Sequence, residues 1–515
     1  MANGIHALNS HEIRMKKILL IGLFLSSFSL FAQKQKPKNF LIFLVDDLGW
    51  QDLSLPFADQ KTPWNSLYRT PNLEKLAARG IKFTHAYANQ NCTPTRVSLL
   101  TGMNALSHKV TSWTFQKDKN PDEGGDPKFQ VPAWNMNGLS PYENKNSIHA
   151  TSIASLLAEN GYATIHAGKA HFGAYGSPGE NPKLHGFQIN IGGSAAGQPA
   201  SYSGIQNFGN KTNGAPNDIR AVPHLNRFWG KDIHLTEALT QETMRVMDSV
   251  LIHPKPFFLL FSNYAVHTPI QPDKRFVQHY YDLGIDSTEA KYASLVEGMD
   301  KSLGDWIDYL DENKLTENTV IVFLSDNGGL TDVGRGKNGR NTYNTPLRSG
   351  KTSGYEGGLR IPFVMSGIGK KGSVNHENII VDDVFPSILQ LTNIKPKSKI
   401  QHVDGLSLVP IIQGKNSNQN RFFTWHYPHM RTNGSPDIQP FSAIRQGDWK
   451  LIFFHKDQHF ELYNTRADLS EKNNLFTSLP EKGQFLAKKL GEKLIGSNSK
   501  MLIDREKQKE IIYPF

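Results

Sequence analysis

The chain has 515 residues, of which 38% are hydrophobic, 10% aromatic and 20% charged. This composition is that of a globular protein with room for two or three domains, and it excludes a disordered or collagen-like chain. Lys and Arg number 57 against 47 Asp and Glu, and the net charge of +10 fits a polyanionic partner without establishing one. The single cysteine, Cys92, excludes an internal disulfide, a cysteine-based zinc site and an iron–sulfur cluster.

The N-terminus has the features of a targeting segment. Two lysines precede an apolar run over residues 18–31, and the small residue Ala32 ends it. This pattern predicts a secretory signal peptide over residues 1–32, with 1–14 as an upstream extension and Met15 as the start. A membrane anchor is the alternative, although the run is short for a membrane span. We therefore expect an exported protein, periplasmic or secreted, of a Gram-negative bacterium, without a stable membrane span.

Short apolar runs, each followed by polar residues, alternate with helical patterns. Continuous apolar runs predict strands buried on both faces, as in parallel sheets. Cap residues and helical spacing predict the helices between them. The alternation predicts an α/β fold with a large, mostly parallel sheet flanked by helices. The strands are expected over residues 39–45, 162–167, 256–261 and 319–324, and the helices over 70–80, 151–160 and 287–313.

The pattern changes from about Arg421, after a polar stretch over residues 414–420 that we take as the boundary. Shorter strand-like runs follow over residues 441–444, 449–454 and 460–463, and a polar helix follows over 481–495. We predict a main domain over 33–415. The remainder, 416–515, is predicted to form a smaller C-terminal α+β subdomain with an antiparallel sheet and a terminal helix.

Oxygen-bearing side chains follow two of the predicted strands. Asp46 and Asp47 come directly after the first strand, and Asp326 and Asn327 follow the fourth. Ligands bind at the carboxyl ends of the strands in parallel sheets. Oxygen donors suit Ca²⁺ or Mg²⁺ better than Zn²⁺. A metal site is therefore one interpretation, and helix capping at each strand-to-helix turn is the other.

Cys92 opens a segment with unusual spacing. Pro94 suits the first turn of a helix, which places Cys92 at the helix N-terminus, where free N–H groups favour an anion. Arg96 adds a positive charge one turn further on. An isolated cysteine is more often a small buried apolar residue. The spacing C-x-P-x-R, four residues, then T-G, however, is long and specific.

The segment from Cys92 to Gly102 resembles the signature of type I sulfatases, the formylglycine-dependent branch of the alkaline phosphatase superfamily. The resemblance covers nearly the whole chain after residue 32, and several ordered matches are stronger than any single motif. The main domain, 33–415, is then the catalytic one. Further matching segments are Lys169–Gly173, His267–Pro269, Gly350–Pro362, Asp404–Gly414, Gly447–Leu451, Glu461–Tyr463 and Asn473–Leu475.

The resemblance implies the nucleophile and the metal. A formylglycine-generating maturase would oxidise Cys92 to formylglycine (3-oxoalanine), whose aldehyde hydrates to a geminal diol. One hydroxyl attacks the sulfur of a sulfate ester, the sugar or aryl alcohol leaves, and the second hydroxyl then expels sulfate. One Ca²⁺ ion would polarise the sulfate. Its ligands would be Asp46, Asp47, Asp326 and Asn327, completed by the oxidised side chain of Cys92 or by a sulfate oxygen.

The resemblance also implies roles for charged residues. Arg96 would hold the diol, while Lys169 and Lys351 would neutralise the ester oxygens. Asp326 would accept the proton of the nucleophile. His267, helped by Lys351, would protonate the leaving oxygen, and His171 would act as the base for sulfate release. Without the resemblance, the lysines would be interpreted as surface charges and the histidines as hydrogen-bonded core residues.

Two alternatives remain. Two-zinc relatives in the superfamily typically have His after the matching Asp, so Asn327 favours one oxygen-bound metal and a sulfate ester. A formylglycine-dependent phosphonate or phosphodiester hydrolase is the alternative enzyme. A non-catalytic protein that binds sulfated glycans is the alternative outside the enzymes.

Two long stretches, residues 103–150 and 173–233, are expected to shape access for the substrate. Tryptophan rings can stack on a sugar, and neighbouring Arg and His side chains can pair with its sulfate. We therefore expect the substrate to be a sulfated polysaccharide or oligosaccharide, algal or host-derived. We expect no nucleic-acid partner. Ordinary surface polarity is the alternative for each residue. The candidate substrate-binding residues are His108, Trp113, Arg220, His224, Arg227, Arg335 and His426, with Arg340, His429 and Arg431 as further candidates for the rim.

Overall fold

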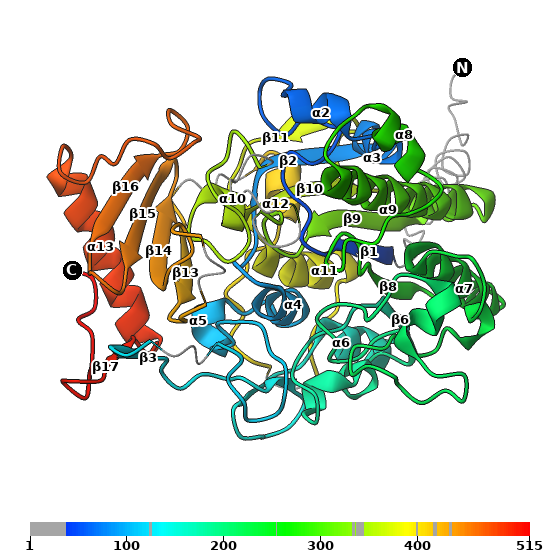
Figure 1. Ribbon diagram of the computed structural model, residues 1–515, viewed down its shortest axis with the longest axis horizontal. Helices are drawn as coiled ribbons and strands as arrows, with labels where there is room; N and C mark the ends of the chain where they lie inside the picture. The colour runs from blue at the N-terminus through cyan, green and yellow to red at the C-terminus, as the bar shows by residue number, and fades with distance from the viewer. Residues whose placement is uncertain are drawn as a thin grey trace, which may run out of the picture. The chain divides into compact units, whose positions relative to one another are not determined.

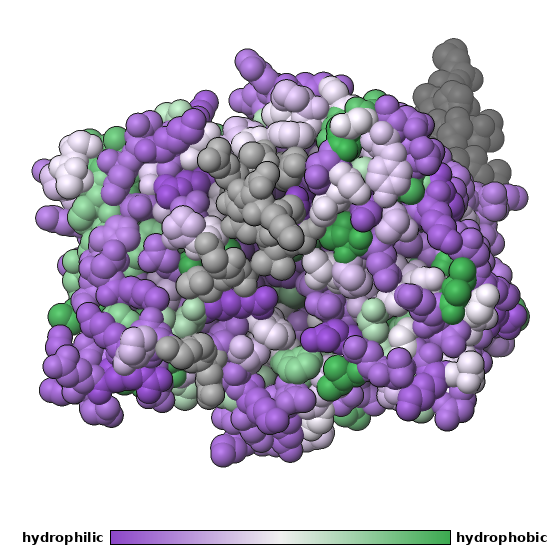
Figure 2. All heavy atoms as spheres, in the orientation of Figure 1, coloured by the Kyte–Doolittle hydropathy of each residue, from purple (hydrophilic) through white to green (hydrophobic). Residues whose placement is uncertain are grey.

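The computed structural model describes residues 38–122, 126–253, 255–331, 335, 344–397, 400–415, 420–431 and 435–515. The predicted signal peptide, residues 1–32, lies outside this part of the chain. In the described part, no helix combines the length and the apolar character that a membrane crossing needs. The face in Figure 2 is mostly hydrophilic, and apolar side chains are exposed on it singly or in small groups.

A nine-stranded sheet lies at the centre of the described chain (Figure 1). Its strands, in spatial order, are β11 (Ser373–Asn375), β2 (Gly80–Tyr87), β10 (Arg360–Ser366), β9 (Thr319–Ser325), β1 (Asn39–Val45), β8 (Phe257–Ser262), β6 (Ala163–Gly168) and β7 (Ile189–Ile191), and β12 (Ile379–Ile380) pairs with β2. Strand β1 is parallel to β8 and β9, whereas β10 is antiparallel to β2 and β9. The predicted mostly parallel sheet is confirmed.

Strand β1 shows why the central strands are apolar throughout. All of its residues are buried. Phe40, Ile42 and Leu44 contribute to one hydrophobic core. The alternate residues Leu41, Phe43 and Val45 contribute to a second core. Both faces of the strand are thus covered, which is why the sequence is continuously apolar instead of alternating.

Helices cover both faces of the sheet (Figure 1). Helices α3 (Pro71–Ala78), α7 (Leu235–Leu251), α8 (Val277–Asp282) and α9 (Ser287–Glu312) contribute to the core that contains Phe43. Helices α4 (Cys92–Thr101), α6 (Ile153–Glu159) and α11 (Val384–Thr392) contribute to the opposite core. The Asp286 carboxylate accepts from the N–H groups of Thr288 and Glu289 and so caps α9 where the sequence predicts its start.

A smaller antiparallel sheet and a helix form the C-terminal part, as predicted. Its strands are β13 (Phe422–Tyr427), β14 (Phe441–Gln446), β15 (Trp449–Phe454) and β16 (Phe460–Asn464), and its helix is α13 (Pro480–Gly496). We expected no strand at β13. Contacts join Lys38–Phe515 into one compact unit, so the boundary at residue 415 stays a prediction.

The long connecting stretches contain only short elements in their described residues. Ile503 of β17 pairs with Gln130 of β3, so the C-terminal tail contacts the stretch that follows α4. The remaining elements are α2 (Pro63–Leu67), α5 (Ala105–His108), β3 (Phe129–Gln130), β4 (Gly138–Ser140), β5 (Ser147–His149), α10 (Glu356–Leu359), α12 (Val409–Ile412), β17 (Ile503–Asp504) and β18 (Lys509–Glu510).

Candidate active site

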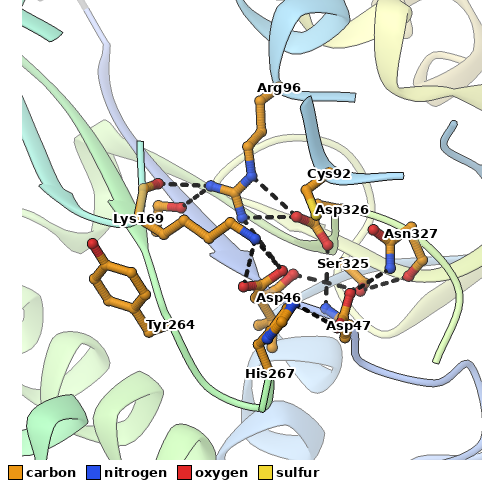
Figure 3. A network of polar contacts seen from close by, with 12 residues as sticks. Asp46, Asp47, Cys92, Arg96, Lys169, Tyr264, His267, Ser325, Asp326 and Asn327 are labelled. Carbon is orange, nitrogen blue, oxygen red and sulfur yellow. Dashed lines mark hydrogen bonds and ion pairs between the residues drawn. The ribbon is translucent and has the colours of Figure 1, made fainter. Parts of the chain in front are cut away.

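The acidic residues predicted from the strand ends lie together (Figure 3). Strands β1 and β9 pair in parallel, with Val45 opposite Ser325, so the residues that follow them are neighbours. The N–H of Asp47 donates to Asp326 Oδ1 at 3.2 Å, and Asn327 Nδ2 donates to Asp47 Oδ1 at 2.8 Å. Asp46, Asp47, Asp326 and Asn327 are fully buried.

Cys92 is the first residue of α4, which is the position at a helix N-terminus that the sequence predicts, and it is buried. One turn on, Arg96 connects the helix to the strand ends. Its Nε and Nη2 donate to Asp326 Oδ2 at 3.0 and 2.7 Å. Its Nη1 donates to the Lys169 carbonyl at 2.6 Å and to Ser262 Oγ at 2.7 Å. Arg96 therefore fixes the position of α4, and of Cys92, against β6, β8 and β9.

Three cationic or potentially cationic side chains contact the acidic pair at the end of β1. Lys169 Nζ donates to both oxygens of Asp46, at 2.8 and 2.7 Å. Lys351 Nζ lies 2.6 Å from Asp47 Oδ1 and 3.5 Å from Cys92 Sγ. His267 Nε2 lies 3.4 Å from Asp47 Oδ2. The structure thus brings the predicted lysines and His267 to one place from three separate segments.

These contacts set the protonation of the acidic pair. Burial raises the pKa of the Asp46 carboxyl well above its ordinary value, although Lys169 opposes this. The pKa of Asp47 lies below its ordinary value. Burial alone would raise it, but the electrostatic effects of Lys351 and His267 together are larger. Burial lowers the pKa of His267 to about 3, against the opposing effect of Asp47.

Two further predicted residues complete the group. His171 Nε2 lies 2.8 Å from the Thr114 carbonyl and therefore donates to it, while the buried Nδ1 has no hydrogen-bond partner. Burial lowers the pKa of His171 well below its ordinary value, so the ring is neutral at pH 7. Burial raises the pKa of the Cys92 thiol. The unmodified thiol is therefore a weak nucleophile at neutral pH.

The donor set fits a hard divalent cation. Donor atoms of Asp46, Asp47 and Cys92 lie within 4.8 Å of one another. Asp47 Oδ2 and Asn327 Oδ1 are buried oxygens without a hydrogen-bond partner. An unsatisfied buried polar group costs about 1–3 kcal/mol, which a bound cation offsets. Carboxylate and amide oxygens are the ligands that Ca²⁺ and Mg²⁺ prefer.

A cavity of about 230 Å³ opens beside Cys92. His171, His267 and Lys351 line it together with the predicted substrate-binding residues Trp113 and Arg220. The rim candidate Arg431 lines it as well. Residues that we did not predict also contribute. Thr268 and Thr352 lie within matching segments and Asn91 precedes Cys92, so the motifs could have pointed to these three, whereas no motif marks the others. The unpredicted lining residues are Asn91, Phe115, Gly197, Gln198, Thr268, Leu330, Thr331, Thr352 and Ile438.

Two predicted histidines lie elsewhere. His108 is buried, and its ring lies 3.1 Å from Ser98 Oγ and accepts from the N–H of Val110 at 3.0 Å. The His426 ring is held between Ser442 Oγ and the Lys500 carbonyl. Because the protein itself satisfies both rings, neither is among the described residues that line the cavity.

The other candidates outside the cavity lining have contacts elsewhere or are exposed. Arg335 is buried against Asp52 and Glu289, at 2.6 and 2.9 Å. Arg227 lies 3.6 Å from Glu242 on the surface. The geometry therefore does not support a substrate-binding role for these residues. His224 is exposed outside the cavity, the His429 ring lies 2.9 Å from Thr111 Oγ1, and Arg340 lies outside the described residues.

Comparisons with known proteins agree with this geometry. The family model described as Sulfatase matches residues 38–394, and the model described as N-sulphoglucosamine sulphohydrolase, C-terminal, matches residues 350–500. A sulfatase of Formosa agariphila is 29% identical over 543 residues, covering 95% of this chain and 94% of that protein. An N-acetylgalactosamine-6-sulfatase of Canis lupus familiaris is 28% identical over 464 residues, covering 86% and 77%.

Solved structures show the same fold. The crystal structure of Ps i-CgsB in complex with k-i-k-neocarrahexaose superposes with a TM-score of 0.68 at 24% identity. The match covers 89% of this chain and 93% of that one. The matched range 38–394 contains every residue of the group around Cys92 described above.

Proposed function

Because the chain belongs to the sulfatase family and is a sulfuric ester hydrolase, we propose that it removes sulfate from a sulfated oligosaccharide or polysaccharide. The observation that carries the proposal is Cys92, which begins α4 beside Lys351 in the cavity next to the buried acidic residues. The resemblance to an N-acetylgalactosamine-6-sulfatase and the tryptophan in the cavity wall support a sugar substrate.

The proposed cofactors are formylglycine at position 92 and one divalent cation, Ca²⁺. When present, the hydrated aldehyde supplies a hydroxyl nucleophile, and the cation supplies positive charge at the sulfate oxygens. Asp46, Asp47, Asp326 and Asn327 would hold the cation, since they provide buried oxygens at adjacent strand ends. The oxidation of Cys92 removes its sulfur and requires an oxidant and a separate maturase.

The residues of the chain then have distinct tasks. Arg96 positions α4 and the Asp326 carboxylate through its hydrogen bonds. Lys169 and Lys351 hold positive charge where the sulfate oxygens bind. Lys351 lies 3.5 Å from the position 92 side chain, and we propose that it assists the departure of the alcohol together with His267. His171 has an unpartnered Nδ1, which suits it to accept a proton during sulfate release.

The test is turnover of 4-nitrophenyl sulfate by protein produced with and without a formylglycine-generating maturase. We expect activity only in the matured protein, with peptide mass spectrometry showing loss of the thiol and gain of an aldehyde at position 92. Cys92→Ala should show no turnover. It should still fold, which its circular dichroism spectrum checks. Activity from an unmodified cysteine would refute the proposed nucleophile.

The same preparation separates the alternatives. Faster hydrolysis of bis(4-nitrophenyl) phosphate than of the aryl sulfate would favour a phosphodiester hydrolase. Binding of sulfated sugars without any turnover by the matured protein would favour a non-catalytic role. We also propose export to the periplasm or the medium, which cell fractionation and N-terminal sequencing of the mature protein test.

A further inference from the structure

One side of the cavity beside Cys92 combines aromatic rings with arginines. The arginine–aromatic wall consists of Trp113, Phe115, Arg220 and Arg431, all of which line the cavity. Arg431 Cζ lies 5.1 Å from the Trp113 ring centroid, and Arg220 Cζ lies 5.6 Å from that of Phe115. The two aromatic centroids are 6.1 Å apart. The wall is therefore a continuous row in which an arginine flanks each ring.

The Trp113 ring is held in one orientation from behind. Its Nε1 donates to Asp122 Oδ1 at 3.0 Å, and the buried Asp122 also accepts from Ser112 Oγ at 2.6 Å. The indole N–H is thus already used inside the protein. What Trp113 offers the cavity is its ring surface, which suits stacking with the apolar face of a sugar.

The backbone on the other side of the wall is equally fixed. The Phe115 carbonyl accepts from the N–H of Tyr175 at 2.8 Å. The Tyr175 hydroxyl donates to the carbonyl of Ile219, the residue before Arg220. The Arg220 carbonyl accepts from the N–H of Ala200 at 2.9 Å. These contacts connect three distant segments, so the wall is prepared before a ligand binds.

The Arg and Lys side chains that line the cavity bring positive charge to it, and Arg220 has an acidic partner in Asp218, 4.0 Å from its Nη1. Arg220, Arg431 and Lys351 line it, and the described lining residues include no Asp or Glu. Lys351 contacts Asp47 and the position 92 side chain, so it belongs to the reaction centre. The two arginines lie instead on the aromatic wall. A guanidinium matches the oxygens of a sulfate or a carboxylate with two parallel hydrogen bonds.

We propose that the arginine–aromatic wall binds a second anionic group of the glycan, either on the sugar whose sulfate ester is hydrolysed or on the sugar next to it. The inference rests on the proposed function, because it places the scissile ester at position 92. The substrate class is then a glycan with two anionic groups close together. The second group is either another sulfate or the carboxylate of a neighbouring uronic acid, and both present the same oxygens to Arg220 and Arg431.

Three probes distinguish the two sources. They are N-acetylgalactosamine 6-sulfate, its 4,6-disulfate, and a disaccharide in which the 6-sulfated sugar is linked to a uronic acid. Isothermal titration calorimetry with Ca²⁺ on the protein whose Cys92 has not been converted measures binding without hydrolysis of the probes. We expect one or both doubly anionic probes to bind about 10- to 100-fold more tightly than the monosulfate, because a hydrogen bond to a charged group contributes more to the binding free energy than a neutral one. The preference should weaken with added salt.

The variants Arg220→Met and Arg431→Met keep much of the side-chain length and remove the charge. The double variant should lose the preference for the doubly anionic probes. Arg245→Met is the matched control, because Arg245 is an exposed arginine that pairs with Glu242 on α7. It should keep the preference.

Equal affinity for the three probes, including no measurable affinity for any, would overturn the inference. A preference that survives in the double variant would overturn it as well. Failure of the proposed function has a separate sign, which is absence of aryl sulfate turnover by matured protein. The kinetic counterpart is the ratio of kcat/KM values for doubly and singly anionic sugars, which should fall about 10- to 100-fold in the double variant.

Discussion

The geometry around Lys351 makes a quantitative prediction about turnover. Lys351 Nζ lies 3.5 Å from Cys92 Sγ, the position proposed for the nucleophilic oxygen. A charge at this distance from a full negative charge contributes about 5 kcal/mol at an effective dielectric of ~20, and about 2 kcal/mol for half a charge. A loss of about 2 kcal/mol lowers the rate roughly 30-fold. Lys351→Ala should therefore reduce turnover by about 30-fold or more.

The effect should depend on the alcohol that departs. A nitrophenolate spreads its charge over the ring, whereas a sugar alkoxide concentrates it on one oxygen. Lys351→Ala, and His267→Ala beside it, should therefore slow the release of sulfate from a sulfated sugar more than from 4-nitrophenyl sulfate. Removal of one preorganised electrostatic contact typically costs on the order of 10²–10³ in turnover.

The assay compares kcat and KM on both substrates for the matured wild type, the two variants and Lys183→Ala. Lys183 is an exposed lysine outside the cavity, so its removal controls for a general loss of charge. We expect kcat to fall much more than the affinity for the sugar. Equal losses on the two substrates, or a loss confined to KM, would show that these residues bind the sulfate without assisting departure.

Three further predictions concern the metal and the stability of the fold. Chelation should abolish aryl sulfate turnover and lower the melting temperature, and Ca²⁺ should restore both better than Zn²⁺; activity that survives exhaustive chelation would contradict the metal site. Lys450→Met should destabilise the protein by about 3–5 kcal/mol in denaturant unfolding, because it leaves the buried Glu356 and Glu471, 2.9 and 2.6 Å from Lys450 Nζ, without this partner. Adding Glu471→Gln to Lys450→Met should recover part of the lost stability. A Lys450→Met variant as stable as the wild type would contradict the argument. Burial lowers the pKa of His426 to about 4 and those of His429 and His455 well below the ordinary value, so below pH 6.5 the unfolded chain binds more protons than the folded one. Stability should fall as the pH drops from about 6.5 to about 4, by up to about 1.4 kcal/mol per pH unit for each histidine, and His455→Phe should have the flatter profile in urea unfolding. An identical slope in that variant would exclude His455 as a cause.

The strands that carry the reacting residues were predictable because local sequence determines them. Strand β1 matches its predicted range, and β9 is one residue longer than the range predicted for it. Each is a continuous apolar run with a polar end. Strand β10 was not predicted. Its Pro362 interrupts the strand pattern, and the register shifts between Ile361 and Phe363 where it pairs with β2. Strand β10 forms because it pairs with β2 and β9, which are distant from it in the sequence. The local sequence does not reveal these pairings.

Sequence patterns could not separate the substrate candidates that line the cavity from those that lie outside it. A polar residue in a long loop has the same sequence appearance whether it faces a cavity or has a partner inside the protein. Arg335 and Arg220 both lie in such stretches, but Asp52 and Glu289 contact the first, while the second reaches the cavity. The burial of Asp52 and Glu289 depends on tertiary packing, which single-sequence patterns do not contain.

The reaction and the specificity of this site therefore depend on different kinds of information. Cys92 begins a helix, and the acidic residues and Lys169 directly follow strands, so short motifs fix their positions relative to the sheet. The arginine–aromatic wall instead joins residues near 113, 220 and 431, whose meeting requires the complete fold. A substitution in the wall should change which sugar binds while the sulfate chemistry remains, whereas a substitution at a strand end should abolish turnover of every sulfate ester.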